Sequence, residues 1–282
     1  MQKIINHLVQ LQELTLARAE REALMPGAQL AQLDESIATM MDELPVEVKS
    51  TFSRMLKKSP LAIVPIANKN CSACGMSLPL SLIQAVRSAD KLHTCPNCGR
   101  FLYFTTVTPR RLAVSGSGAR RRTDPPKVGI ERFSAPNLMI PRLEAADRDG
   151  ALAEIAHLLE EQKFVDDGAL LTEAALRREA IVSTAVDHGL AFPHVRGVEG
   201  GGLTLALAIS EKGIRFGGPA KTLTRLIFFM VIPTAASAFY LKLLSGLTAA
   251  FRKEESRDKL MSMETPEDVW KTLIKLTKSS LN

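Results

Sequence analysis

The sequence has few long apolar runs, and this scarcity bears first on membranes and export. The longest strongly apolar stretch lies between Arg225 and Lys242, contains Pro233, and is shorter than the roughly 20 residues that a membrane-spanning helix needs. The opening MQKIINHLVQ is interrupted by polar residues and shows no small-residue cleavage site, so it does not resemble a signal peptide. We therefore expect a cytoplasmic protein without membrane insertion.

Cysteine is also scarce. The chain has 4 cysteines among 282 residues, and they fall in two close pairs. In a chain with no visible export signal, such pairs favour metal thiolates over disulfides.

Aromatic residues make up only 5% of the chain, and none interleaves with the arginines Arg120 to Arg122. The net charge of +6 is concentrated in residues 105–145, where 8 basic and 3 acidic side chains give a net of +5. Arginine can bind nucleic-acid phosphates through its charge and planar fork, but without aromatic residues the segment is no stacking platform for single strands. We favour a solvated basic linker and keep nucleic-acid binding as an alternative.

The residues before this segment begin with three predicted helices. Apolar positions at helical spacing predict the first up to about Ala23, where Pro26-Gly27 follows. A third helix is predicted from about Pro45 to Lys58. In the second helix the apolar positions step by three and four, which is typical of the seam of a short antiparallel hairpin; they are Leu30, Leu33, Ile37, Met40 or Met41, and Leu44.

The cysteine pairs have metal-binding spacing. Cys71 and Cys74 form one CxxCG turn, and Cys95 and Cys98 form another. Two such turns supply the tetrahedral set of about 2.3 Å bonds that Zn²⁺ prefers, and the following glycines suit the positive φ that the turns require. Redox pairs or disulfides do not explain the matching CG endings. We predict a structural zinc ion with no open position for catalysis, and we interpret the nearby His93 as an ordinary surface residue.

The run from Leu44 to Phe104 resembles the four-cysteine zinc ribbon that follows a helical hairpin in a bacterial family of coiled-coil zinc-ribbon proteins. Besides both CxxCG turns, the matching features are Leu44-Pro45, the apolar strand Leu61 to Ile66, Leu78-Pro79 and Leu102-Tyr103. Members of that family with assigned roles are thought to bind proteins or nucleic acids. The resemblance therefore implies an interaction module.

From Leu138 onward, helical and strand patterns alternate. Helices are predicted from an N-cap at Asp147, over 169–179, over 237–252 and over 265–278, where Thr265 is the N-cap and Pro266 the first helical residue. Strands are predicted over 190–193, 203–209 and 226–232. This alternation predicts an α/β domain, a mixed sheet with helices on both faces.

One segment of this domain carries the candidate chemistry. Residues 177–194 read RREAIVSTAVDHGLAFPH, so an apolar run ends in an imidazole, His194, at the end of a predicted strand. A neutral imidazole is a competent nucleophile, and phosphoryl transfer needs little beyond positioning and charge stabilisation. Arg178 would supply a cation, and Ser183 or Thr184 a hydrogen bond.

The half of the chain from Leu138 to about Leu276 resembles the enzyme IIA domains of the phosphotransferase system, in the fructose and mannitol class that includes nitrogen-related regulatory proteins. The matching features are the helix opening at Asp147, Arg178-Glu179, Ser183-Thr184, Gly189 to His194, Gly213-Ile214, Ile232-Pro233 and Leu241 to Leu247. The spacing from Arg178 to His194 also fits the family pattern. The resemblance implies that His194 accepts a phosphoryl group from the phosphocarrier protein HPr. It also implies that His194 passes this group to a IIB domain, or does not pass it on if the domain is regulatory.

Two positions depart from that family pattern. The family often has a second histidine beside the phosphorylated one, and in this sequence Tyr240 occupies its place. A tyrosine hydroxyl can donate to a phosphate oxygen but is neutral near pH 7. We interpret His188 as a loop residue and not as a substitute for the missing histidine.

These features divide the chain into a helical hairpin at 1–60, a four-cysteine zinc ribbon at 61–104, a basic flexible linker at 105–136 and an enzyme IIA-like phosphoacceptor domain at 137–282. We expect a regulatory phosphohistidine carrier, because a zinc ribbon adds nothing to sugar transport. Its expected partners are an HPr-type phosphocarrier and either a IIB domain or a regulated protein. Two alternatives are a nucleic-acid or transcription-machinery binding protein with a non-transferring IIA fold, and a IIA component of fructose or mannitol uptake.

Overall fold

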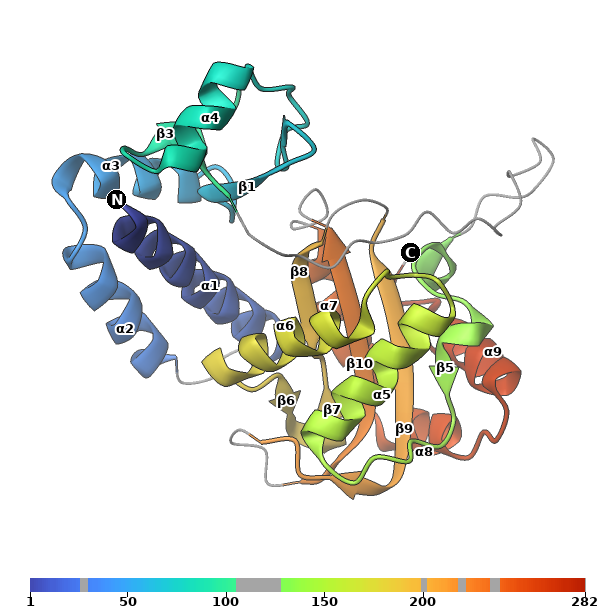
Figure 1. Ribbon diagram of the computed structural model, residues 1–282. Helices are drawn as coiled ribbons and strands as arrows, with labels where there is room; N and C mark the ends of the chain where they lie inside the picture. The colour runs from blue at the N-terminus through green and yellow to red at the C-terminus, as the bar shows by residue number, and fades with distance from the viewer. Residues whose placement is uncertain (26–29, 105–127, 199–201, 218–221, 234–238, 282) are drawn as a thin grey trace. The chain divides into compact units, whose positions relative to one another are not determined.

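The computed structural model describes residues 1–25, 30–104, 128–198, 202–217, 222–233 and 239–281 (Figure 1). Contacts divide the described residues into two compact units: the N-terminal unit up to residue 104, and the C-terminal unit from residue 128 onward. Arg120 to Arg122 lie outside the described residues. None of the helices in these ranges is both long and apolar enough to cross a membrane.

The N-terminal unit begins with the three predicted helices: α1 (Gln2–Leu24), α2 (Ala31–Asp42) and α3 (Val46–Leu56). Helices α1 and α2 contact each other. Eight residues of α1 are buried, whereas none of α2 is. The seam predicted for α2 is therefore only partly covered, with Ile37, Met40 and Met41 half-buried against the core. The buried apolar residues of α1 share a core with Phe52 of α3 and with Ile63 and Phe101 of the strands that follow.

Those strands form a four-stranded sheet in the order β2-β1-β4-β3, with β1 (Ile63–Ala67), β2 (Asn70–Cys71), β3 (His93–Thr94) and β4 (Phe101–Tyr103). Strands β1 and β4 are parallel, while the two outer pairs are antiparallel. Helix α4 (Leu80–Ser88) connects β2 to β3.

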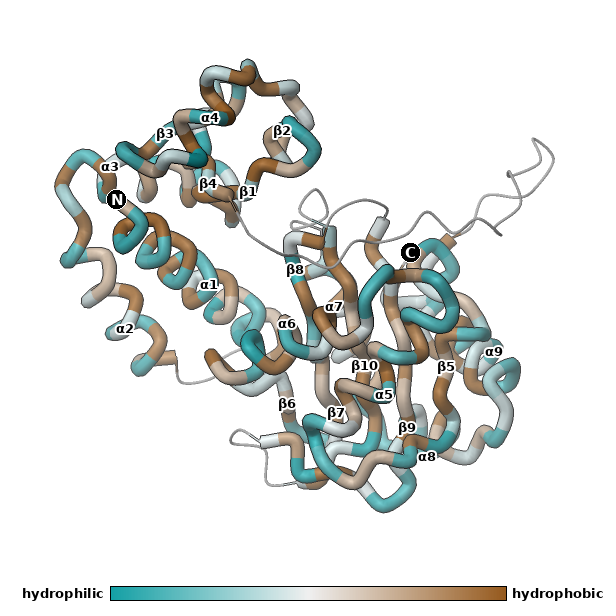
Figure 2. Tube along the Cα trace, in the orientation of Figure 1, coloured by the Kyte–Doolittle hydropathy of each residue, from teal (hydrophilic) through white to brown (hydrophobic). Residues whose placement is uncertain are grey.

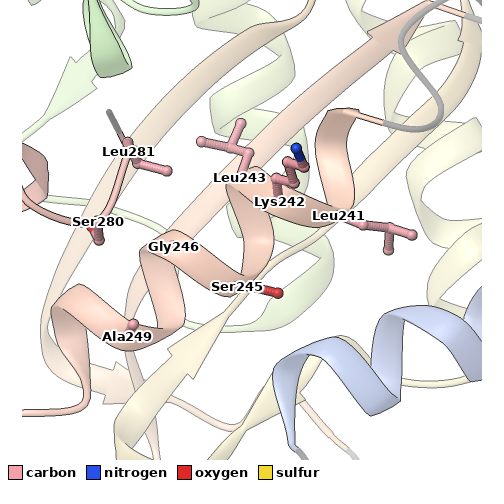
Figure 3. A pocket seen from close by; sticks show the side chains of 8 residues that line it. All are labelled: Leu241, Lys242, Leu243, Ser245, Gly246, Ala249, Ser280 and Leu281. Carbon is pink, nitrogen blue, oxygen red and sulfur yellow. The ribbon is translucent and has the colours of Figure 1, made fainter.

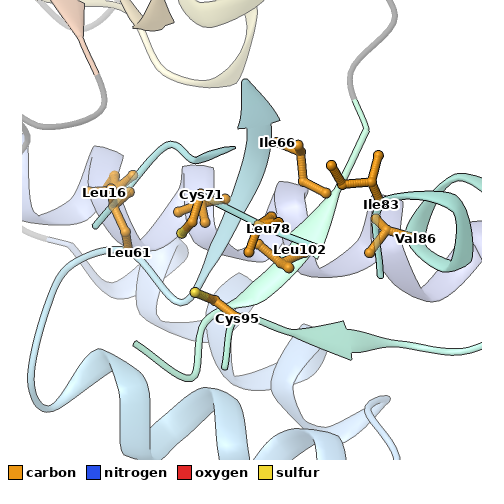
Figure 4. Close-up of a cluster of buried hydrophobic side chains, with 10 residues drawn as sticks. Leu16, Leu61, Ile66, Cys71, Leu78, Ile83, Val86, Cys95 and Leu102 are labelled. Carbon is orange, nitrogen blue, oxygen red and sulfur yellow. The ribbon is translucent and has the colours of Figure 1, made fainter. Parts of the chain in front are cut away.

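The two faces of this sheet serve two cores. Ile63 and Phe101 pack with Leu8, Leu11 and other side chains of the helices. Side chains alternate between the two faces of a strand, so Val64 and Leu102, next to Ile63 and Phe101, point to the opposite face. There they belong to a second cluster (Figure 4), which consists of Leu16, Leu61, Val64, Ile66, Cys71, Leu78, Ile83, Val86, Cys95 and Leu102. Because Leu16 comes from α1, that helix takes part in both cores.

A buried glutamine joins α1 to the sheet. The Gln12 side chain is 6% exposed. Its Oε1 accepts hydrogen bonds from the backbone N–H groups of Ala62 (2.7 Å) and Ile63 (2.9 Å), and its Nε2 donates to the Ile63 carbonyl (3.0 Å). The amide therefore satisfies backbone groups that have no water available.

The C-terminal unit contains a six-stranded sheet in the order β5-β9-β10-β7-β6, with β8 also paired to β10. Its strands are β5 (Met139–Ile140), β6 (Ala185–Val186), β7 (Leu190–Ala191), β8 (His194–Val198), β9 (Thr204–Ile214) and β10 (Thr224–Pro233). Pairs β9–β10 and β6–β7 are antiparallel and the others parallel, which confirms the predicted mixed sheet. β10 is buried along nearly its whole length, and Figure 2 shows its apolar run in shades of brown.

Helices lie on both faces of this sheet, as predicted. They are α5 (Arg148–Glu161), α6 (Gly168–Ile181), α7 (Phe239–Phe251), α8 (Glu254–Met261) and α9 (Pro266–Thr277), with short 3-10 turns at Gly129–Arg132, Pro136–Leu138 and Asp187–Gly189. Figures 1 and 3 place α5 and α7 on opposite faces. Both predicted N-caps are confirmed: Asp147 accepts from the Gly150 N–H, and Thr265 from the Asp268 N–H.

Three structural features differ from, or were missed by, the sequence analysis. Helix α8 was not predicted, because its eight residues have low apolar periodicity and only Leu260 is buried. Residues 128–136, placed in the linker, pack into the C-terminal unit, where Ile130 is buried and the Ser134 hydroxyl donates to the Leu205 carbonyl. The strand expected over 190–193 is interrupted, as described below. The division into four segments stays a prediction.

The C-terminal residues close over α7. Gly246 has no side chain, and a Cβ there would lie 2.3 Å from Leu281 Cδ2 and 2.9 Å from the Ser280 carbonyl oxygen. A hollow of about 580 Å³ lies beside this contact, lined by one side of α7 and by Ser280 and Leu281 (Figure 3). A glycine at this position therefore allows the chain end to lie on the helix.

The Gln12 contacts give a stability prediction. Gln12→Ala should lower the free energy of unfolding of the N-terminal unit by about 2–4 kcal/mol, because buried N–H groups lose their acceptor. Urea denaturation followed by circular dichroism measures the change. Gln10→Ala, at an exposed position of α1, is the matched control and should cost less than about 0.5 kcal/mol. Equal stability of the two variants would contradict the role assigned to Gln12.

Candidate functional site

The four predicted metal ligands lie together in the N-terminal unit. The Sγ atoms of Cys71, Cys74, Cys95 and Cys98 are all within 4.8 Å of one another. The pairs Cys71–Cys98 and Cys74–Cys95 are each 3.7 Å apart, close to the edge of about 3.8 Å of a tetrahedron with 2.3 Å metal–sulfur bonds. The donor set therefore fits one tetrahedral Zn²⁺.

The two cysteine turns have matching backbone geometry. The Gly75 N–H donates to the Cys71 carbonyl (2.8 Å), and the Gly99 N–H donates to the Cys95 carbonyl (2.9 Å). Both glycines have φ of 73°, in the left-handed region that L side chains rarely adopt. The structure thus confirms the reason given for the two CG endings.

The thiols differ in proton affinity. Burial raises the pKa of the Cys71 and Cys95 thiols. Burial also acts to raise the pKa of Cys74, but hydrogen bonds from the Met76 backbone, the Asn97 side chain and the neighbouring thiols outweigh it and lower this pKa to about 6. A metal ion that binds all four sulfurs must therefore displace protons from the buried thiols.

The predicted phosphoacceptor, His194, is the first residue of strand β8 and does not lie beyond the end of a strand. Strand β7 stops at Ala191, and β8 begins at His194 in the same register along β10: Leu190 pairs with Leu226, and His194 with Met230. Pro193 has no N–H for the ladder, although its carbonyl still accepts from the Met230 N–H (2.9 Å). The expected strand over 190–193 is therefore confirmed only at 190–191, and residues 192–193 interrupt the ladder immediately before His194.

The ring orientation of His194 is set by this interruption. His194 is 2% exposed, and its Nδ1 lies 3.0 Å from the Phe192 carbonyl oxygen. A carbonyl oxygen only accepts, so this hydrogen bond assigns the proton to Nδ1. The free lone pair of the ring is then on Nε2.

Thr184 is connected to the same backbone. Its carbonyl accepts from the Phe192 N–H (3.2 Å), so Phe192 links Thr184 to His194. The buried Glu179 carboxylate accepts from both the backbone N–H (3.0 Å) and the hydroxyl of Thr184. Glu179 therefore positions Thr184, a role that the sequence analysis did not assign to it.

The predicted cation lies at the end of α6. Arg178 is 8% exposed, and its Nη1 donates to the Val182 carbonyl (2.9 Å), immediately before Ser183 and Thr184. Helix α6 contacts β8, the strand of His194. The Ser183 hydroxyl oxygen accepts from the Ala185 N–H (3.2 Å), so this side chain supports its own loop.

Tyr240 lies beside His194, where the missing second histidine was expected. Its side chain is fully buried near the start of α7, and its ring centroid is 5.9 Å from that of His194. Arg196 also reaches this ring: its Nη1 donates to the Tyr240 hydroxyl oxygen at 3.4 Å. His188 instead is exposed in the turn Asp187–Gly189, as expected of a loop residue.

Arg196 is the residue of this site that the sequence analysis missed. It follows His194 by two positions in β8, and residues i and i+2 of a strand share a face. Because the sequence analysis ended the strand before His194, this signal was not available there. Correct strand boundaries would have placed Arg196 beside the imidazole.

The comparisons with known proteins agree with this architecture. Residues 133–276 match the family described as "Phosphoenolpyruvate-dependent sugar phosphotransferase system, EIIA 2". Residues 70–102 match the C4-type zinc ribbon domain. The first match includes His194, and the second includes all four cysteines.

Individual relatives resemble the C-terminal half. A fructose-specific EIIA component from Haloferax volcanii is 30% identical over 124 residues, which cover 44% of this chain and 80% of that protein. A nitrogen regulatory protein from Pseudomonas aeruginosa is 23% identical over 147 residues, covering 52% of this chain and 96% of that protein. The crystal structure of nitrogen regulatory protein IIA-Ntr from Neisseria meningitidis superposes with a TM-score of 0.46 at 25% identity, over 50% of this chain and 96% of that one.

The family match covers half of the chain, and the Haloferax volcanii relative is matched over most of its length. The chain therefore belongs to the EIIA 2 family of the phosphoenolpyruvate-dependent sugar phosphotransferase system.

Proposed function

We propose that His194 accepts a phosphoryl group on Nε2 from an HPr-type phosphocarrier protein, and that this phosphorylation regulates a partner of the protein. The observation that carries the proposal is the hydrogen bond between His194 Nδ1 and the Phe192 carbonyl, which directs the lone pair to Nε2. In the reaction, Nε2 forms the new bond to phosphorus while the donor's bond to phosphorus breaks, and the departing donor atom keeps that electron pair. The Nδ1 proton stays on His194.

The surrounding residues supply the positioning that phosphoryl transfer requires. Glu179 accepts a hydrogen bond from Thr184, and the Thr184 carbonyl accepts one from the Phe192 N–H. Because Phe192 orients the imidazole, the orientation of His194 depends on both residues. Arg178 places a permanent positive charge at the end of α6, where it favours a dianionic phosphoryl group. In this role the protein works as a phosphohistidine carrier.

Phosphate transfer tests this function directly. With enzyme I, HPr and labelled phosphoenolpyruvate, wild-type protein should take up acid-labile label and His194→Ala should take up none, because the nucleophile is missing. His188→Ala is the matched control, an exposed histidine six positions away that should label at the wild-type rate. Arg178→Gln should label on the order of 10²-fold more slowly. Equal labelling of His194→Ala and wild type would refute the proposal.

The N-terminal unit, we propose, holds one zinc ion on Cys71, Cys74, Cys95 and Cys98. The 3.7 Å sulfur spacings and the paired glycine turns support zinc, which prefers tetrahedral thiolate sites, over metals that prefer square-planar or octahedral coordination. When bound, zinc supplies a structural crosslink. Because Leu16 and both buried cysteines share one core, the ion stabilises the position of α1 as well as the two turns.

Metal analysis tests the zinc site. Purified protein should contain one zinc per chain by atomic emission, and Cys95→Ser should lose it and unfold its N-terminal unit at lower urea. His93→Ala, close to the site in β3, should keep the metal. Zinc affinity should fall as pH falls, because protons compete for the buried thiols whose pKa is raised. Full zinc content in Cys95→Ser would contradict this ligand set.

We favour a regulatory role over sugar uptake because the same chain carries the ribbon. The ribbon exposes apolar side chains beside the first cysteine turn, with Met76 38% and Leu80 64% exposed. Such residues suit contact with a protein partner. The fructose-specific relative supports uptake as the second candidate, with a IIB domain as the next acceptor.

Onward transfer separates these two roles. Phosphorylated protein mixed with a purified fructose-type IIB domain should keep its label if the role is regulatory. A fructose-type EIIA protein serves as the positive control for the same IIB domain. Complete transfer within the time taken by that control would favour the uptake role and overturn our preference.

A further inference from the structure

Arg196 and Tyr240 form a pair beside His194 that the proposed function does not use. We propose that Arg196 binds the phosphoryl oxygens on His194 and that Tyr240 holds the guanidinium in position to do so. The inference rests on the proposed phosphorylation of His194. It assigns a second cation to that site and a positioning role to the buried tyrosine.

The strand geometry places the two side chains on one face. His194 pairs with Met230 and Arg196 with Ile232, so both belong to the regular part of β8 before its register shift next to Pro233. Their side chains therefore leave the sheet in the same direction, about 7 Å apart along the strand. An arginine side chain is long enough to span that separation.

The contacts to Tyr240 bring the groups closer together. The imidazole lies 5.9 Å from the tyrosine ring, measured between centroids, and the Arg196 guanidinium carbon lies 5.9 Å from the same centroid. The Arg196 Nη1 donates to the tyrosine hydroxyl at 3.4 Å, a long hydrogen bond. Both functional groups therefore lie around one ring that is fully buried and packed at the start of α7.

The chemistry of the two residues is complementary. Guanidinium is charged at every accessible pH and offers several N–H donors in a planar fork that matches phosphate oxygens. Arg196 is half-buried, so its attraction to a dianion is screened less than it would be on the open surface.

Arg196 and Tyr240 do not change which bonds form and break in the transfer step. His194 Nε2 forms the bond to phosphorus, the donor atom leaves with its electron pair, and no proton moves to or from Arg196. The guanidinium offsets charge that gathers on the three phosphoryl oxygens, in the reaction and in the phosphorylated protein. Arg196 therefore acts on both the rate of phosphorylation and the lifetime of phosphohistidine.

The labelling assay with four variants tests the pair. Arg196→Gln should be labelled on the order of 10²-fold more slowly, and Arg196→Lys should recover part of that loss because it restores the charge. Tyr240→Phe should slow labelling about 2- to 12-fold, the effect of one hydrogen bond. The double variant Arg196→Gln/Tyr240→Phe should be labelled at the same rate as Arg196→Gln alone, because Tyr240 acts only by positioning Arg196.

The control is Arg225→Gln, an exposed arginine on the other end of β10 whose guanidinium donates to the Glu211 carbonyl. It should be labelled at the wild-type rate, and all variants should melt cooperatively by circular dichroism. Wild-type labelling of Arg196→Gln would overturn the proposal while leaving the phosphoacceptor function intact. A Tyr240→Phe effect of equal size with and without Arg196 would overturn the positioning role.

Phosphate binding separates this inference from the carrier function. Inorganic phosphate should shift the imidazole NMR resonances of His194 in the wild type, and Arg196→Gln should need at least about tenfold more phosphate for the same shift. If the wild type takes no label but binds phosphate through Arg196, the carrier function fails and the anion site stands. If Arg196→Gln binds phosphate as well as the wild type, the anion site fails.

Discussion

The hydrogen bond between His194 and the Phe192 carbonyl is the interaction on which the site depends. It exists because the strand beside β10 is interrupted at Phe192 and Pro193 and resumes at His194 in the same register. The interruption turns one backbone carbonyl toward the imidazole that follows it two residues later. A continuous ladder would direct that carbonyl to a neighbouring strand, and the ring would lose the group that assigns its proton.

Other buried polar groups extend this constraint outward. Glu179 holds Thr184, Thr184 holds Phe192, and Phe192 orients His194, so a helix, a loop and a strand are joined by hydrogen bonds. Each group in the series is desolvated and would be costly to leave unpaired. In the N-terminal unit, Gln12 has the same function between α1 and β1. In both units, polar contacts specify the geometry and apolar burial supplies most of the stability.

Much of the architecture could be predicted from local patterns. Asp147 and Thr265 are short polar residues before apolar helical runs, and both are N-caps because such side chains accept from the first free N–H groups. The cysteine turns were predictable for a similar reason, since the spacing and the glycine φ are local properties. Helix α8 and the extent of the linker were not, because Leu260 and Ile130 show their burial only when distant elements pack on them.

The sequence by itself determined the residue types of both sites, the spacing of the four cysteines, the family and the identity of the candidate acceptor, since these depend on covalent order and short-range geometry. Only the tertiary structure decided that His194 begins a strand, that Arg196 shares its face and that Tyr240 also contacts Arg196. The physical reason is that β10 supplies the register for β7 and β8 from more than 30 residues away. A register set by a distant strand leaves no periodic signal within the segment that it orders.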